Sequence, residues 1–199
     1  MRARRRTSEM NSEAAPVPVS IVDERYVREP PSAQLAVDLF KGEWTTFLSQ
    51  HLSVQAGNVP LMIDPRIDWV IQQAGGVDRR DVLELGPLEA AHTYMLEQAG
   101  ASVTAIESNT HAYLRCLIVK ELLNLRNSSF LLGDFVPYME STDRFFDLVV
   151  ASGVLYHSPD PVRMLTALAR VTDRVAIWTH YYDPPLMEQT PSRCSGLFQ

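Results

Sequence analysis

A glycine and an acid that follows it have the residue types and the spacing for ligand chemistry. Gly86 ends the apolar run 81–85, and Glu107 closes a second run, 102–106, roughly 20 residues further along. In nucleoside-binding folds the ligand lies at the carboxyl ends of parallel strands, and an acid at this spacing accepts both hydroxyls of a ribose. We therefore expect Glu107 to bind a ribose and Gly86 to let the backbone turn beneath the nucleoside.

The turn after Gly86 lacks the glycine-rich pattern of dinucleotide-binding proteins. A pyrophosphate needs a close approach to the backbone and a helix N-terminus, which the pattern G-x-G-x-x-G provides. Here the glycine is followed by Pro87-Leu88-Glu89. Because a negative charge at Glu89 would repel a phosphate, we expect a nucleoside without phosphates, and S-adenosylmethionine fits this description.

Strand and helix patterns alternate from residue 81 onward. Helical periodicity stops at Gly100, and Asn109 and the pair Asp160-Pro161 are typical helix starts. Five short runs between the helices are apolar and nearly continuous, as in strands buried on both faces: 81–85, 102–106, 129–132, 145–151 and 174–178. The alternation predicts an α/β fold, a Rossmann-like parallel sheet with helices on both faces and five identifiable strands.

The part of the chain before the sheet has signals for helices and one short strand. Ser32 and Asp64-Pro65 have the pattern of helix starts, the run 17–22 has that of a short strand, and we expect Trp44 and Trp69 to pack in the core. We expect four segments: a disordered N-terminal arm at 1–31, a helical N-terminal cap at 32–76, the sheet domain at 77–183 and a polar tail at 184–199.

Four motifs in a fixed order resemble those of class I S-adenosylmethionine-dependent methyltransferases. They read ELGPLEAAHTYMLEQAG, VTAIESN, FLLGDF and FDLVVASGVLYHSPDP, and the resemblance covers roughly 81–181. The segment VLYHSPDP is similar to the branch that includes the tRNA wobble-uridine carboxymethyl transferases. The resemblance implies S-adenosyl-L-methionine as cofactor and a methyl acceptor that is a small molecule or, alternatively, a tRNA.

The resemblance also implies roles for single residues. Glu84 would help to hold the methionine ammonium, Asp134 would lie near the adenine amino group with Phe135 beside the ring, and the loop 152–157 would face the acceptor. His157 would be a general base or would orient that loop, and Tyr156 would be a contact or, as the weaker candidate, a catalytic base. His92 lies one helical turn in and could face the ligand, but we expect it to be a surface histidine. The cofactor-binding residues expected on these grounds are Glu84, Gly86, Glu107, Ser108, Asp134, Phe135 and Ser152.

The resemblance is incomplete after the fifth strand. Class I methyltransferases usually continue with a helix and two more strands, whereas here only a polar stretch follows Tyr182. We expect a truncated relative, a fragment, or a protein whose exposed sheet edge pairs with a second copy in a homodimer. Two other functions stay open: a non-catalytic remnant that binds the cofactor or nothing, and an NAD-type oxidoreductase, which the missing glycine pattern disfavours.

Composition and residue spacing disfavour several other classes of function. The net charge of -6 disfavours unspecific binding to nucleic acid, although it leaves room for a tRNA held by a local patch. No apolar run approaches the ~20 residues of a membrane helix, and no spacing of the five histidines predicts a metal site. Cys116 lies in an apolar helical run far from Cys194, so we expect a reduced thiol and a cytoplasmic protein.

Overall fold

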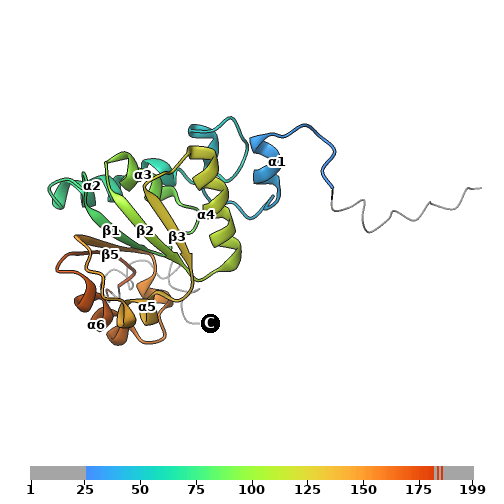
Figure 1. Cartoon of the computed structure of the whole chain (residues 1–199). Helices are drawn as coiled ribbons and strands as arrows, with labels where there is room; N and C mark the ends of the chain where they lie inside the picture. The colour runs from blue at the N-terminus through green and yellow to red at the C-terminus, as the bar shows by residue number, and fades with distance from the viewer. Residues whose placement is uncertain (1–25, 182, 184, 186–199) are drawn as a thin grey trace, which may run out of the picture. The chain divides into compact units, whose positions relative to one another are not determined.

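Five parallel strands form the centre of the structure, a computed structural model that describes residues 26–181, 183 and 185. The strand order is β3-β2-β1-β4-β5, which confirms the expected parallel sheet (Figure 1). The strands are β1 (Asp81–Leu85), β2 (Ser102–Glu107), β3 (Ser128–Leu132), β4 (Leu148–Ser152) and β5 (Val175–Trp178). The short strand expected at 17–22, most of the N-terminal arm and nearly all of the polar tail lie outside the described residues.

The register brings the carboxyl ends of the strands to one edge of the sheet. Leu85 pairs with Ile106, Glu107 with Leu132, and Ser152 with Trp178. Because all the strands run in the same direction, the loops that leave them meet at this edge, where parallel sheets bind their ligands.

Helices cover both faces of the sheet, as the sequence predicts. The helices α1 (Ala33–Asp38), α2 (Pro65–Gln73), α3 (Ala91–Gln98) and α4 (Thr110–Leu123) lie over one face, and α5 (Phe135–Ser141) and α6 (Pro161–Val171) over the other (Figure 1). Each face has its own apolar cluster, and successive strand residues alternate between them: Val82 packs on the first and Leu83 on the second. The described part of the chain has three short 3-10 turns, η2 (Leu48–Gln50), η3 (Leu61–Ile63) and η4 (Leu155–His157).

The predicted helix starts are confirmed, and one helix was missed. The side chains of Ser32, Asp64, Asn109 and Asp160 each accept a hydrogen bond from a backbone N–H in the first turn of their helix. The missed helix is α5, which spans only seven residues and contains Pro137. Proline is tolerated in a first turn, and Asp134 caps this helix in the same way as the other four residues cap theirs.

Some of the other expectations about single residues are confirmed, and one is wrong. Trp44 and Cys116 are buried, and the Cys116 thiol is free, as expected. Trp69 is 59% exposed on α2, so the expectation that it packs in the core is wrong. Among residues 26–181, 183 and 185 the longest helix has 14 residues, and none has the length and apolar character that a membrane span requires.

Glu89 is a fully buried carboxylate that ties the N-terminal segment to the turn after β1. Its oxygens accept hydrogen bonds from the backbone N–H groups of Thr45 and Thr46 at 2.7–3.1 Å, and one lies 3.6 Å from Arg115 Nε. A buried charge is tolerated only when it is paired and hydrogen-bonded in this way. Glu89 therefore fixes residues 45–46 against α4.

We predict that Glu89→Gln lowers the free energy of unfolding by about 2–4 kcal/mol, because an amide N–H2 would face backbone donors and Arg115 would lose its buried partner. The matched control is Glu43→Gln, since Glu43 also pairs with Arg115 but is 44% exposed and should cost at most about 1 kcal/mol. Urea unfolding of both variants measures the difference. Equal costs would show that burial of Glu89 does not matter.

Glu84 is the second buried carboxylate, in the middle of the sheet. It is 2% exposed, and its Oε2 accepts a hydrogen bond from Thr93 Oγ1 on α3 at 2.5 Å. Burial raises the pKa of Glu84 from 4.5 to about 7, the Thr93 hydrogen bond opposes this rise, and the charge of Glu107 adds to it. Folding therefore takes up a proton at Glu84 between pH 4.5 and pH 7.

We predict that this proton makes the native protein less stable as pH rises through that window, with the full loss present above pH 7. Glu84→Gln removes the titration and keeps an acceptor for Thr93. Relative to the native protein, the variant should gain about 2–3 kcal/mol of unfolding free energy between pH 5 and pH 8, measured by urea unfolding at both pH values. Parallel pH curves for the two proteins would contradict the burial of an ionisable Glu84.

Candidate functional site

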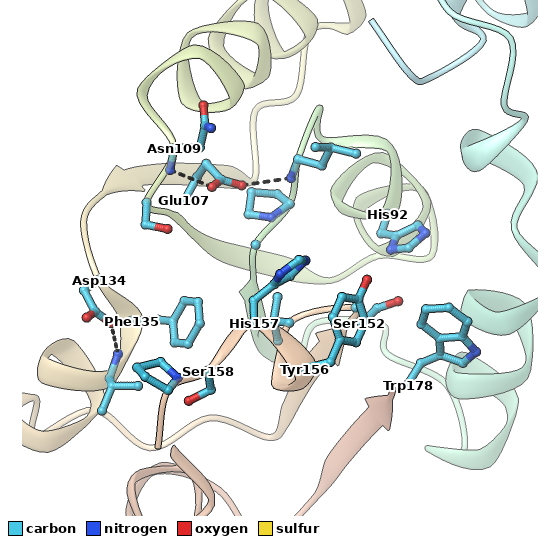
Figure 2. A pocket seen from close by; sticks show the side chains of 18 of the residues that line it. His92, Glu107, Asn109, Asp134, Phe135, Ser152, Tyr156, His157, Ser158 and Trp178 are labelled. Atoms are coloured by element: carbon cyan, nitrogen blue, oxygen red, sulfur yellow. Dashed lines mark hydrogen bonds between the residues drawn. The ribbon is translucent and has the colours of Figure 1, made fainter. Parts of the chain in front are cut away.

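A cavity of about 700 Å³ lies at the carboxyl ends of the strands. Loops after β1, β2, β3 and β4 and the last residue of β5, Trp178, line it, and α2 and α3 contribute further side chains. Of the residues predicted for the site, all except Glu84 line the cavity: Gly86, Glu107, Ser108, Asp134, Phe135, Ser152, Tyr156 and His157. Figure 2 shows Glu107, Asp134 and Phe135 toward one end, and His92, Ser152 and Trp178 toward the other.

Glu107 presents a fixed carboxylate to the cavity. Its side chain is 7% exposed; Oε1 accepts from Asn109 N at 2.8 Å and Oε2 from Leu88 N at 3.1 Å (Figure 2). These two bonds use one acceptor position on each oxygen, and a carboxylate has about four in all. Each oxygen can therefore accept one further hydrogen bond, as a vicinal diol would require.

Gly86 occupies a position where a side chain would not fit. Its φ is 65°, in the left-handed region, and an added Cβ would lie 2.6 Å from Val154 Cγ1. The backbone at the end of β1 therefore passes directly against the loop after β4. The absence of a side chain leaves the cavity open between Glu107 and that loop.

Asp134 and Phe135 form the wall beside Glu107. Oδ1 of Asp134 accepts a hydrogen bond from Val136 N at 2.8 Å and so caps α5, while Oδ2 has no hydrogen bond to another described residue. Phe135 is the first residue of that helix, and its ring lies beside the cavity in Figure 2. An acceptor oxygen next to an aromatic ring suits a flat heterocycle that carries an amino group.

Glu84 and Glu89, the two acids near the turn after β1, do not lie where the sequence suggests. Glu84 does not line the cavity, because alternation along β1 directs it to α3 and Thr93. Its expected contact with a methionine ammonium stays a prediction. Glu89 points to Thr45 and Thr46, so it does not disfavour a phosphate in the cavity, contrary to the expectation from the sequence.

The charges that do line the cavity still favour a ligand without phosphates. Glu107, Asp134 and Asp160 supply three carboxylates. The two arginines there are already paired, Arg66 with Asp64 and Arg163 with Glu140 at 2.6 Å. An anion would therefore meet few free donors, whereas a cation would meet carboxylates.

Aromatic rings gather at the other end of the cavity. The rings of Tyr156 and His180 stack with their centroids 4.5 Å apart, and the Tyr156 and His157 centroids are 4.4 Å apart. The guanidinium of Arg66 lies 4.3 Å from the centroid of the Trp178 ring. Tyr156 and Trp178 are about two-fifths exposed, so this wall is open to a second molecule.

Asp64, Arg66 and His92 form a cluster that sequence analysis did not identify. Asp64 is 5% exposed; its oxygens accept from the N and Nε atoms of Arg66 at 2.9–3.0 Å, and Oδ2 lies 3.0 Å from His92 Nε2. Burial raises the pKa of Asp64, but the hydrogen bonds from Arg66 and His92 outweigh it and lower the pKa to about 2. Burial lowers the pKa of His92 from 6.5, and the bond to Asp64 opposes that.

The expectation of a surface histidine at position 92 is therefore wrong. The His92 side chain is 14% exposed, and it lines the cavity together with Arg66. The cap at Asp64 was visible in the sequence, but no local pattern links position 64 to position 92.

Comparisons with known proteins agree with this geometry. The methyltransferase domain family matches residues 83–175. The tRNA U34 carboxymethyltransferase of Nautilia profundicola is 30% identical over 104 residues, which cover 51% of this chain and 34% of that protein. The chain thus spans about a third of the length of this curated relative.

Solved structures share the fold. The N-terminal domain of EvdMO1, crystallised in the presence of SAH and D-fucose, is 25% identical, with a TM-score of 0.61 over 75% of this chain and 64% of that chain. Monomeric WbdD is 19% identical, with a TM-score of 0.57 over 75% of this chain and 39% of that chain. Residues 83–175 thus match the methyltransferase domain family, and the parallel sheet that they build has the class I S-adenosylmethionine-dependent methyltransferase fold.

Proposed function

We propose that the cavity binds S-adenosylmethionine and that the protein transfers its methyl group to a small molecule. The observation that carries this proposal is Glu107, a buried carboxylate held by two backbone N–H groups with one acceptor position free on each oxygen. The ribose would lie on Glu107, the adenine beside Asp134 and Phe135, and the methionine over Gly86. Bound in this way, S-adenosylmethionine supplies an electrophilic methyl group.

The residues of the cavity fit this ligand in shape and charge. The glycine at position 86 leaves space that a Cβ would fill, and the carboxylates of Glu107, Asp134 and Asp160 suit a cationic molecule without phosphates. The loop 152–157 closes one side and would exclude water from the reacting atoms. The protein would then have to position the acceptor and provide for the removal of the acceptor's proton.

The aromatic wall supports a small molecule as acceptor. The exposed parts of the Tyr156 and Trp178 side chains offer apolar contact area for a sugar ring or an aromatic ring. A relative is named as a tRNA carboxymethyltransferase, so transfer to a tRNA base is the second candidate, against which the net charge of -6 weighs. A protein that binds the cofactor without turnover is the third.

Two further features belong to this proposal. The free, buried thiol of Cys116 suits a reducing compartment, so we place the protein in the cytoplasm. On β5, Val175, Ile177 and Trp178 are 39–44% exposed, and this apolar edge would suit a homodimer.

We predict that the native protein binds S-adenosylmethionine and S-adenosylhomocysteine (SAH) in calorimetric titrations. Glu107→Ala should weaken the binding free energy of both ligands by about 1–3 kcal/mol, since the ribose would lose a charged hydrogen-bond partner. Glu121→Ala, an exposed carboxylate of α4 away from the cavity, is the control and should leave the affinity unchanged. A folded native protein that binds neither ligand would contradict the proposal.

We predict that Asp134→Asn separates the two roles of this residue. Asparagine caps helices as well as aspartate does, so the melting temperature should stay within about 2 °C. Its amide N–H2 would replace Oδ2 and face the adenine amino group, so SAH affinity should fall about tenfold, or roughly 1.4 kcal/mol. Unchanged affinity would mean that Asp134 serves only as a cap.

A further inference from the structure

We propose that His92 is the general base of the reaction, that Asp64 positions it, and that the acceptor group is therefore a hydroxyl. This inference rests on the proposed methyl transfer and adds the proton chemistry at the acceptor end of the same cavity. His92 is the second residue of α3, it lines the cavity, and Figure 2 shows it on the side of Ser152 and Trp178.

The hydrogen bonds of Asp64 determine the tautomer of His92. Three donors of Arg66 converge on this carboxylate, which is therefore ionised and can only accept hydrogen bonds. His92 Nε2, 3.0 Å from Asp64 Oδ2, must then carry a proton. In a neutral imidazole the other nitrogen, Nδ1, is unprotonated and can accept a proton.

Nothing else in the described part of the chain uses Nδ1 of His92. The bond to Asp64 is the single hydrogen bond that the ring makes to a described residue. A carboxylate that holds one imidazole nitrogen and leaves the other facing substrate is the arrangement by which hydrolases orient a general base. Asp64 is then a positioning residue, since it acts through the ring.

The groups facing His92 favour a ring that is neutral before the reaction. Asp64 and Arg66 face it from the start of α2; Glu107 and Tyr156 also line the cavity. Burial and the positive charge of Arg66 disfavour the imidazolium, while Asp64 stabilises it once a proton arrives. His92 is thus ready to accept a proton and can return it to solvent.

His157 is less suited to this role. It is exposed, and the described residues place the ring of Tyr156 beside it but no carboxylate that would orient it. The geometry assigns the base to His92 and leaves His157 as a contact in the loop after β4.

A base of this kind identifies the acceptor class. A neutral amine attacks through its own lone pair and a carboxylate is already ionised, but a hydroxyl must lose its proton as it attacks. The acceptor O–H would give its proton to Nδ1, and the oxygen would form a bond to the methyl carbon. The C–S bond breaks, its electron pair stays on sulfur, and the products are a methyl ether, SAH and a proton on His92.

The first test needs no acceptor. Nitrogen chemical shifts of His92, measured by NMR at pH 7.5 on the protein saturated with SAH, should show the proton on Nε2 and none on Nδ1. Asp64→Asn should increase the share of the other tautomer, because an asparagine amide can donate to Nε2 as well as accept from it. A proton on Nδ1 in the native protein overturns the proposal.

The second test measures methyl transfer from labelled S-adenosylmethionine to catechol, benzylamine and benzoate as hydroxyl, amine and carboxylate probes. His92→Gln keeps a donor for Asp64 but has no basic nitrogen, so transfer to catechol should fall at least about 100-fold while SAH affinity stays within about threefold. The control is His111→Gln, since His111 also contacts a carboxylate, Glu43, but is 60% exposed and lies outside the cavity lining.

The outcomes separate this inference from the proposed function. Native protein that does not bind SAH contradicts the proposed function itself. If SAH binds, transfer to catechol that survives in His92→Gln overturns the assignment of the base, and transfer only to benzylamine or benzoate overturns the hydroxyl acceptor. If no probe is methylated, the nitrogen chemical shifts of His92 are the test of the proposal, and a proton on Nδ1 overturns it.

Discussion

The two hydrogen bonds that hold the Glu107 carboxylate are the constraint on which the cavity depends. They join the end of β2 to the backbone of the turn after β1 and to the backbone of the residue that directly precedes α4. A carboxylate with so little exposure is stable only if donors replace the water it has lost. The same bonds that make Glu107 tolerable in the fold also fix its direction, so the site is formed before any ligand arrives.

The acceptor end depends on a different part of the chain. Asp64 and Arg66 precede the sheet. Arg66 lines the cavity itself, whereas Asp64 caps α2 and acts on the cavity through its bond to His92 on α3. Residues 45–46, which lie earlier in the same N-terminal segment, are held to the turn after β1 by their hydrogen bonds to Glu89. The sheet thus supplies the nucleoside end through its strand loops, and the preceding segment supplies the wall where a second molecule would bind.

Local signals predicted the strands, most helices and one end of the site. Gly86, Glu107, Asp134 and Ser152 could be placed together because each ends or follows a strand of a parallel sheet, and the carboxyl ends of such strands share an edge. The helix α5 was missed because seven residues with a proline give little periodicity.

Long-range packing is what the sequence did not reveal. The pairing of Asp64 with His92, and of Glu89 with Thr45, joins positions 28 and 44 residues apart, for which no periodic pattern exists. The burial of Glu84 toward α3 follows from strand alternation, but the face to which position 84 belongs is known only once α3 is placed. Trp69 was assigned to the core by residue type, although its helix turns it outward.

A crystal structure of the protein soaked with SAH tests the central claim most directly. The account predicts electron density with both ribose hydroxyls within hydrogen-bond distance, about 2.6–3.2 Å, of the two Glu107 oxygens, the adenine beside Phe135, and the sulfur facing the loop 152–157. Density for SAH elsewhere on the molecule, or a ribose in this cavity that makes no contact with Glu107, would contradict it.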